Sequence, residues 1–370
     1  MGLLDYYRQF EAMTEEEVNA ELREQAAERK RKALTRVEAL DLSHTTWPEL
    51  PHPRVVNAIT FVARRGLHRY PHLSATELRK ELAERHGVAP ERLILGNGAA
   101  ELLSAAARAV ISPGQVLLTP WPSYPLYPLI ARRAHGRAVR VSGGVDALLA
   151  AAAEEPDARV VVIASPNDPT GELLAAEELA RLLAGLPDGV AVLLDEALVD
   201  FADAQPASAS LELLQQHSRL LVFRSFSKAW GLAGLRIGYA IGGPGSAELL
   251  AELEPDLGVS EVSQAGALEA LRSCSGLIEE RVRAICGQRP RVTEELRARG
   301  FEVSNSQANF VWAAHPVLDG AELAARLARS GILVAAGHGL GEPRHVRVGL
   351  RSEWASDRLL EAVDKALADA

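Results

Sequence analysis

Short apolar runs recur along the first two thirds of the chain, and each of them ends in a turn. The runs at residues 116–119, 160–164 and 190–194 are too short for helices and consist mainly of Val, Ile and Leu. Such continuous runs are typical of strands that are buried on both faces of a parallel sheet. Because helical patterns intervene, at 99–103 and 147–153 for example, we predict an α/β domain with a mostly parallel central sheet.

The pattern changes after Gly243, where longer helical segments are followed by short strands. We expect helices at about 246–253 and 262–296, the second kinked or broken by Pro290. Short strands are expected around Val303, Val311, Leu333 and Arg347, with helix between them, which indicates a small α+β domain.

The chain has 370 residues, more than one compact core usually holds, so two domains are expected. We predict a large cofactor-binding domain at 51–255 and a small C-terminal domain at 256–370. Residues 1–50 are predicted to form a helix and an arm that pack with the small domain or with a partner subunit. A capping box at Thr14 opens this helix, and the arm at 40–51 is extended and punctuated by prolines.

Charge and composition argue against several classes of function. The chain is 48% apolar and has a net charge of −9, which argues against an extended nucleic-acid surface. The basic residues 29–32 are interpreted as one solvated face of the N-terminal helix. Cys274 and Cys286 fit no metal or redox motif, so no metal site is expected, and two thiols in this length suggest a reducing compartment. With no apolar run long enough for a membrane span and no signal-peptide pattern, we predict a cytoplasmic protein without membrane contact.

The richest chemical pattern is the segment 224–236, in which one lysine, Lys228, stands among hydroxyl groups and small residues. A lysine in a tight turn after a strand can be partly desolvated, which lowers its pKa and makes it a nucleophile for a carbonyl group. Ser225, Ser227 and Arg236 supply donors that suit a phosphate.

This segment resembles the Schiff-base lysine segment of pyridoxal-phosphate (PLP) enzymes of the aspartate aminotransferase superfamily, fold type I. The histidinol-phosphate aminotransferase type is the most similar subgroup, and the resemblance covers about residues 40–365. It implies that Lys228 binds PLP and shuttles a proton during catalysis. The residues implied to hold the phosphate are Ala99 and Ala100 through their backbone amides, together with Ser225, Ser227 and Arg236.

The resemblance also implies roles around the cofactor ring and the substrate. Tyr124 would stack on the ring, Asp195 would pair with the ring nitrogen, and the pair Asn167 and Asp168 would lie near the ring oxygen. Tyr70 would reach the phosphate of a neighbouring subunit, which implies a homodimer with shared active sites. The residues implied to contact the substrate are Arg347, preferred over Arg344 and Arg351 as the carboxylate clamp, and His44 in the arm.

Three departures from the family pattern leave the reaction open. Asp168 stands where the family has asparagine, Leu198 where it commonly has tyrosine, and residues 44–47 differ from its usual Asn-Glu-Asn-Pro. The leading hypothesis is an aminotransferase that acts on an amino acid and a 2-keto acid. The alternative is a PLP decarboxylase or lyase that resembles threonine-phosphate decarboxylase, and a remote alternative is a catalytically retired binding protein. The amino acid itself is not readable from the sequence.

Overall fold

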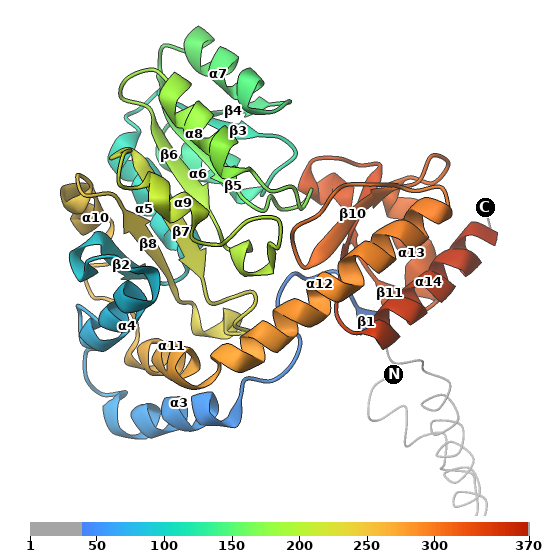
Figure 1. Cartoon of the computed structure of the whole chain (residues 1–370), viewed down its shortest axis with the longest axis horizontal. Coiled ribbons are helices and arrows are strands. Elements are labelled where there is room, and N and C mark those ends of the chain that lie inside the picture. The colour runs from blue at the N-terminus through green and yellow to red at the C-terminus, as the bar shows by residue number, and fades with distance from the viewer. Residues whose placement is uncertain (1–38, 369–370) are drawn as a thin grey trace, which may run out of the picture. The chain divides into compact units, whose positions relative to one another are not determined.

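The computed structural model describes residues 39–368. The helix expected from Thr14 and the basic residues 29–32 lie outside the described residues. Within them, the largest element is a seven-stranded sheet with the order β2-β8-β7-β6-β5-β3-β4 (Figure 1). Only β8 runs antiparallel to its neighbours, so the predicted mostly parallel sheet is confirmed. The strands are β2 (Leu93–Gly96), β3 (Val116–Pro120), β4 (Arg137–Val141), β5 (Ala158–Ala164), β6 (Ala191–Asp195), β7 (Leu220–Ser225) and β8 (Gly238–Gly242).

Helices cover this sheet and bury its apolar side chains. The buried face of α5 (Ala99–Val110) combines alanines with Leu102 and Leu103, and it packs against β6, β7 and β8. The small alanine side chains let this helix lie close to the central strands, so its N-terminus comes to their carboxyl ends. The other helices here are α6 (Leu126–Arg133), α7 (Val145–Glu154), α8 (Ala176–Gly185), α9 (Ala209–Leu213) and α10 (Ala247–Leu253), with the short η1 (Pro90–Arg92), η2 (Val199–Phe201) and η3 (Ala233–Leu235).

The parallel register brings the ends of the central strands to one edge of the sheet. Ala164 pairs with Asp195, and Asp195 pairs with Phe223, so the turns that follow β5, β6 and β7 lie side by side. Open parallel sheets bind their ligands at this edge.

A second, smaller sheet of four antiparallel strands has the order β12-β13-β10-β9. Helices α13 (Gly320–Arg329) and α14 (Glu353–Ala368) accompany it, which confirms the small α+β part of the predicted fold. Gly349 on β13 donates its backbone N–H to Leu42 O at 2.7 Å, which holds the arm beside this sheet. The remaining short elements are β1 (Leu40–Asp41), β9 (Glu302–Val303), β10 (Phe310–Ala314), β11 (Ile332–Leu333), β12 (Ala335–Ala336), η4 (Gly337–Leu340) and β13 (His345–Gly349).

Two long helices join the sheets, and the break between them is not at Pro290. The segment 262–296 is interrupted at Cys274, between α11 (Glu261–Ser273) and α12 (Ser275–Ala298), and Pro290 lies inside α12 without breaking it. Contacts on this stretch offset the lost hydrogen bond of the proline, because Arg289 donates to Phe201 O at 2.9 Å and to Ala308 O at 3.2 Å.

The position of α11 bears on the predicted boundary at residues 255 and 256. This helix packs against α3 (Pro53–Gly66) and α4 (Thr76–His86), whereas α12 continues towards β10 (Figure 1). We therefore propose that the large domain extends to Cys274, where the helix is interrupted. Among the described helices, none is both long and apolar enough to cross a membrane.

Candidate active site

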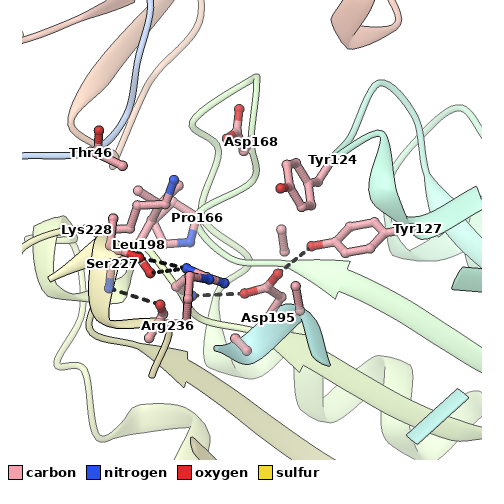
Figure 2. A pocket seen from close by; sticks show the side chains of 16 residues that line it. Thr46, Tyr124, Tyr127, Pro166, Asp168, Asp195, Leu198, Ser227, Lys228 and Arg236 are labelled. Atoms are coloured by element: carbon pink, nitrogen blue, oxygen red, sulfur yellow. Dashed lines mark hydrogen bonds between the residues drawn. The ribbon is translucent and has the colours of Figure 1, made fainter. Parts of the chain in front are cut away.

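A cavity lies at the carboxyl ends of β5, β6 and β7 and at the N-terminus of α5 (Figure 2). It is lined by Lys228 and by most of the residues that the sequence singled out. The lining residues are Thr46, Ala99, Ala100, Tyr124, Tyr127, Ala164, Pro166, Asp168, Asp195, Ala197, Leu198, Ser225, Ser227, Lys228, Ala233 and Arg236.

Lys228 lies in the turn that follows β7, and its apolar neighbours determine where it points. Phe226 and Ala229 are buried in the core, so the chain between them presents Ser227 and Lys228 to the cavity. Lys228 Nζ donates to Thr45 Oγ1. Burial lowers the pKa of Lys228, and the nearby Asp168 and Asp195 carboxylates counter this only in part. The amine therefore loses its proton more readily than an exposed lysine.

An anion-binding end is formed by the turn before α5 and by Arg236. Gly98 has a φ of +95°, and a Cβ at this position would overlap the Arg236 guanidinium. The first amides of a helix have no intrahelical partner and favour negative charge. Arg236 Nη1 donates to Ser227 Oγ at 3.5 Å, and Ser225 Oγ accepts from Ser227 N at 3.0 Å. Helix amides, hydroxyl groups and a guanidinium therefore converge on one place, as a phosphate requires.

Asp195 is the last residue of β6, and its carboxylate is oriented by two donors. Tyr127 Oη donates to Oδ2 at 2.9 Å, and Ala197 N donates to Oδ1 at 3.1 Å (Figure 2). Burial raises the pKa of Asp195, and both hydrogen bonds oppose this. A buried carboxylate that faces a cavity favours a cationic ligand atom.

Tyr127 was not assigned this role from the sequence, although it is fully buried. Its ring also meets the edge of Tyr124, with centroids 5.8 Å apart at 77°, which supports the Tyr124 side chain at the cavity. The sequence signal for this role is a tyrosine within an apolar helical face. Such a tyrosine is buried, and a buried hydroxyl group needs a hydrogen-bond partner.

Arg347 on β13 reaches towards the cavity and contacts two acceptors. Its Nη1 forms an ion pair with Asp168 Oδ1, and its Nη2 donates to Ser43 O at 3.0 Å. The two other candidates for the clamp are placed differently, because Arg344 is exposed and Arg351 donates to Asp41 O. The structure thus favours Arg347 among the three.

Besides Arg347, three of the singled-out side chains do not line the cavity. Asn167 Nδ2 donates to Pro122 O at 3.0 Å and to Thr170 Oγ1 at 2.9 Å, and its Oδ1 accepts from Ser123 Oγ at 2.7 Å. Its amide therefore joins the loop after β5 to the loop after β3, and we assign it no ligand contact. The other two are His44, whose side chain is 70% exposed and lies 3.6 Å from Asp41, and Tyr70, which is 80% exposed.

Two threonines of the arm lie at the site, where the side chain of His44 was expected. Thr45 is buried and accepts from Lys228, while Thr46 lines the cavity. Asn309 Nδ2 donates to Thr45 O at 2.9 Å, which fixes this part of the arm to the small sheet. Residues 44–46 are not part of a strand, and the side chains of Thr45 and Thr46, not that of His44, lie at the site.

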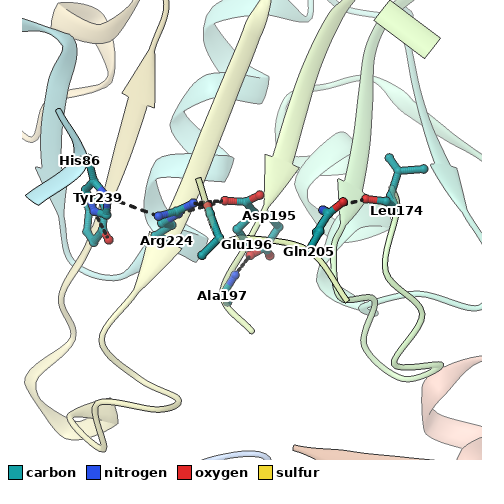
Figure 3. Close-up of polar contacts among 9 residues, drawn as sticks. His86, Leu174, Asp195, Glu196, Ala197, Gln205, Arg224 and Tyr239 are labelled. Atoms are coloured by element: carbon teal, nitrogen blue, oxygen red, sulfur yellow. Dashed lines mark hydrogen bonds and ion pairs between the residues drawn. The ribbon is translucent and has the colours of Figure 1, made fainter. Parts of the chain in front are cut away.

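A buried ion pair lies at the ends of β6 and β7, next to Asp195 in the chain (Figure 3). Arg224 Nη2 is 2.7 Å from Glu196 Oε2, and Arg224 Nε donates to the same oxygen at 2.9 Å. His86 Nδ1 is 3.4 Å from Arg224 Nη1, and burial together with Arg224 lowers the pKa of His86 to about 3. Because Glu196 follows Asp195 and Arg224 precedes Ser225, this pair ties the ends of β6 and β7 together.

Comparisons with known proteins agree on one family. The family model for aminotransferases of class I and II matches residues 37–364. The aromatic amino acid aminotransferase of Corynebacterium efficiens is 33% identical over 332 residues, which cover 88% of this chain and 92% of that protein. Histidinol-phosphate aminotransferase 2 of Methylococcus capsulatus is 34% identical over 331 residues, 85% of this chain and 86% of that protein. The crystal structure of histidinol-phosphate aminotransferase from Sinorhizobium meliloti in complex with PLP has a TM-score of 0.79 at 26% identity and covers 90% of this chain and 92% of that one.

Proposed function

Because this chain belongs to the class I and II aminotransferase family, we propose that it transfers the amino group of an aromatic amino acid to a 2-keto acid at the cavity around Lys228. It is a PLP-dependent aminotransferase of fold type I. The observation that carries the proposal is the convergence of Lys228, Asp195 and Arg236 on one cavity. The relatives reported above are aminotransferases, so the decarboxylase and the retired binding protein are not proposed.

The described residues fit PLP. Gly98 leaves the space that a Cβ would fill, beside the hydroxyl groups and the guanidinium that suit a phosphate. We assign the phosphate to the amides of Ala99 and Ala100 and to Ser225, Ser227 and Arg236. Asp195 would accept a hydrogen bond from the ring nitrogen and keep it protonated, Tyr124 would lie against the ring, and Lys228 would hold the cofactor covalently. Bound PLP supplies an electron sink that weakens the bonds at the Cα of the substrate.

The residues of the chain supply the proton transfer and the orientation. Burial lowers the pKa of Lys228, so Nζ gives up its own proton more readily than an exposed lysine and can carry a proton from the Cα of the substrate to the C4′ atom of the cofactor. Thr45 Oγ1 accepts from Nζ and restricts its position. Tyr127 and the Ala197 amide hold the Asp195 carboxylate in one orientation, so its charge faces the cavity.

The charges of the cavity favour an aromatic donor over a phosphate-bearing one. Among the described residues that line it, the cationic ones are Lys228 and Arg236, and both are assigned to the cofactor. Arg347, which we assign to the substrate carboxylate, is already paired with Asp168. No further cation remains in this lining for a phosphate on the substrate. The relatives named aromatic amino acid aminotransferases support the same choice.

A panel of amino donors tests this substrate class. With 2-oxoglutarate as acceptor, phenylalanine or tyrosine should show a kcat/KM at least ~10-fold above that of histidinol phosphate, since an unmatched charged group in a pocket costs about this much or more. The glutamate formed from 2-oxoglutarate, which every donor would give, is measured by chromatography, with aspartate as a further donor for comparison. A higher kcat/KM for histidinol phosphate, or release of carbon dioxide in place of keto acid, would show the proposal to be wrong.

A homodimer is proposed from the surface around Tyr70. Tyr70, Leu67 and the α3 residue Phe61 expose large parts of their side chains, and such patches mark interaction sites. We propose that Tyr70 reaches the cofactor phosphate of a second copy. Light scattering is expected to give twice the 39.7 kDa of one chain, and Tyr70→Phe should weaken cofactor binding without changing this mass. A fully active monomer would contradict the shared site.

We propose a cytoplasmic location because both cysteines are free thiols. Cys274 and Cys286 are both free, and Cys274 is buried. Burial raises the pKa of both thiols, which keeps them in the less reactive protonated form. Free thiols of this kind are typical of a reducing compartment.

A further inference from the structure

The guanidinium of Arg347 has both of its terminal nitrogens engaged by the protein itself. Asp168 accepts from Nη1, and the backbone oxygen of Ser43 accepts from Nη2 at 3.0 Å. The side chains of Arg347 and Asp168 are only 12% and 11% exposed. A carboxylate ligand binds arginine most tightly through two parallel hydrogen bonds, which use two N–H groups on one edge of the guanidinium. Here the edge formed by the two terminal nitrogens already carries acceptors.

Asp168 is held in place by its loop. Its neighbour Asn167 makes three side-chain hydrogen bonds, one to Thr170 of the same loop and two to Pro122 and Ser123 of the loop after β3. The same loop is attached to the small sheet, because Gln307 N donates to Gly171 O at 2.7 Å. The Asp168 carboxylate therefore meets Arg347 from a fixed backbone, and it lines the cavity that the substrate enters.

The ring of Phe310 restricts the positions that the Arg347 guanidinium can take. The Arg347 guanidinium lies 5.5 Å from the centroid of the Phe310 ring, so an aromatic face borders it. An incoming carboxylate thus meets an arginine whose charge is balanced, and it also meets the negative charge of Asp168. Two carboxylates at one guanidinium repel each other when both are ionised.

We propose that Asp168 is an internal competitor for the substrate carboxylate: it occupies Arg347 in the free enzyme, and amino and keto acids bind by displacing it. The proposal rests on the assignment of Arg347 as the carboxylate site. Asp168 then weakens the binding of every carboxylate ligand and favours the release of the product acid. It acts chiefly on affinity at Arg347 and exchanges no proton with Lys228, although its charge also raises the pKa of that amine.

The test compares a carboxylate with its uncharged amide. Binding of 3-phenylpropanoate and of 3-phenylpropanamide to the PLP-loaded protein is measured by titration calorimetry. In Asp168→Asn the carboxylate should bind ~10-fold more tightly, because a competing ionised group near one arginine is removed, while the amide changes by less than ~2-fold. Asp168→Ala should act in the same direction. The KM for the amino donor should fall in both variants by a larger factor than any change in kcat.

Two further variants separate the outcomes. Glu172→Gln removes a negative charge from the same loop, where Glu172 contacts Thr170 and not Arg347, and should leave carboxylate affinity unchanged. Arg347→Gln should lose the preference for the carboxylate over the amide. Suppose that neither Asp168 variant binds the carboxylate more tightly, while Arg347→Gln loses the preference for the carboxylate over the amide. In that case the role of Asp168 as a competitor is refuted and the proposed function stands. If Arg347→Gln binds the carboxylate as well as the parent protein does, the assignment of Arg347 fails and the competitor fails with it.

Discussion

Lys228→Ala is expected to lower the rate of transamination by about 10⁴-fold, the upper range for removing a positioned general base. Lys228 Nζ is the only amine that lines the cavity among the described residues, and Thr45 holds it in place. The variant should also lose the covalent link to the cofactor. The rate is measured with saturating phenylalanine and 2-oxoglutarate. The link is measured by mass spectrometry after reduction with borohydride, which fixes the cofactor to the chain in the parent protein.

Lys80→Ala is the matched control for this prediction. Lys80 is exposed on α4, so its loss should change neither the rate nor the mass of the reduced protein. A Lys228→Ala protein that still carries the cofactor after reduction would show that another amine holds it. A variant that loses the link but keeps its rate would refute the role of Lys228 as proton carrier.

Arg224→Met is expected to lower the free energy of unfolding by about 3–5 kcal/mol, as breaking a buried pair by removing one partner does. Arg224 and Glu196 have side chains that are 7% and 5% exposed, so the remaining carboxylate would be buried without its partner (Figure 3). Because the pair ties the ends of β6 and β7 together, the variant should also bind the cofactor less tightly. Urea unfolding at saturating cofactor and at zero cofactor measures both effects.

The control is a double-mutant cycle with Glu196→Gln. The double variant should lose less stability than the sum of the single variants, since each single change leaves one charge unpaired. Arg181→Met removes an arginine of similar size from an exposed cluster with Glu178 and Asp146, and should leave the unfolding midpoint nearly unchanged. Equal midpoints for Arg224→Met and Arg181→Met would contradict the role of the buried pair.

Most of the sheet and the cofactor end of the site could be predicted because both depend on short-range signals. The apolar runs that became β5 and β6 are continuous and bounded by turns, and parallel strands bring their carboxyl ends to one edge. Lys228, Asp195 and Ala99 therefore line one cavity, although they lie far apart in the sequence. The break considered at Pro290 does not occur because the proline rule describes an isolated helix, and contacts of Arg289 stabilise α12 beside Pro290.

The arm and the loop after β5 show the limit of prediction from sequence. In the arm, His44 was named, but its side chain is exposed and Thr45 and Thr46 lie at the site. In the loop, Asn167 and Asp168 were both named, and only Asp168 lines the cavity. Irregular segments have no period that relates a residue to a face, so a shift of one residue changes which side chain reaches the ligand.

The sequence by itself determined the order of the strands and turns, and the residue types that suit a phosphate, a ring nitrogen and a reactive amine. These follow from local patterns, because strand ends and helix starts are encoded by adjacent residues. Only the tertiary structure decided that Tyr127 orients Asp195 and that Asp168 pairs with Arg347. Each of these contacts joins segments far apart in the chain, and its direction depends on how two elements pack, which no local pattern specifies.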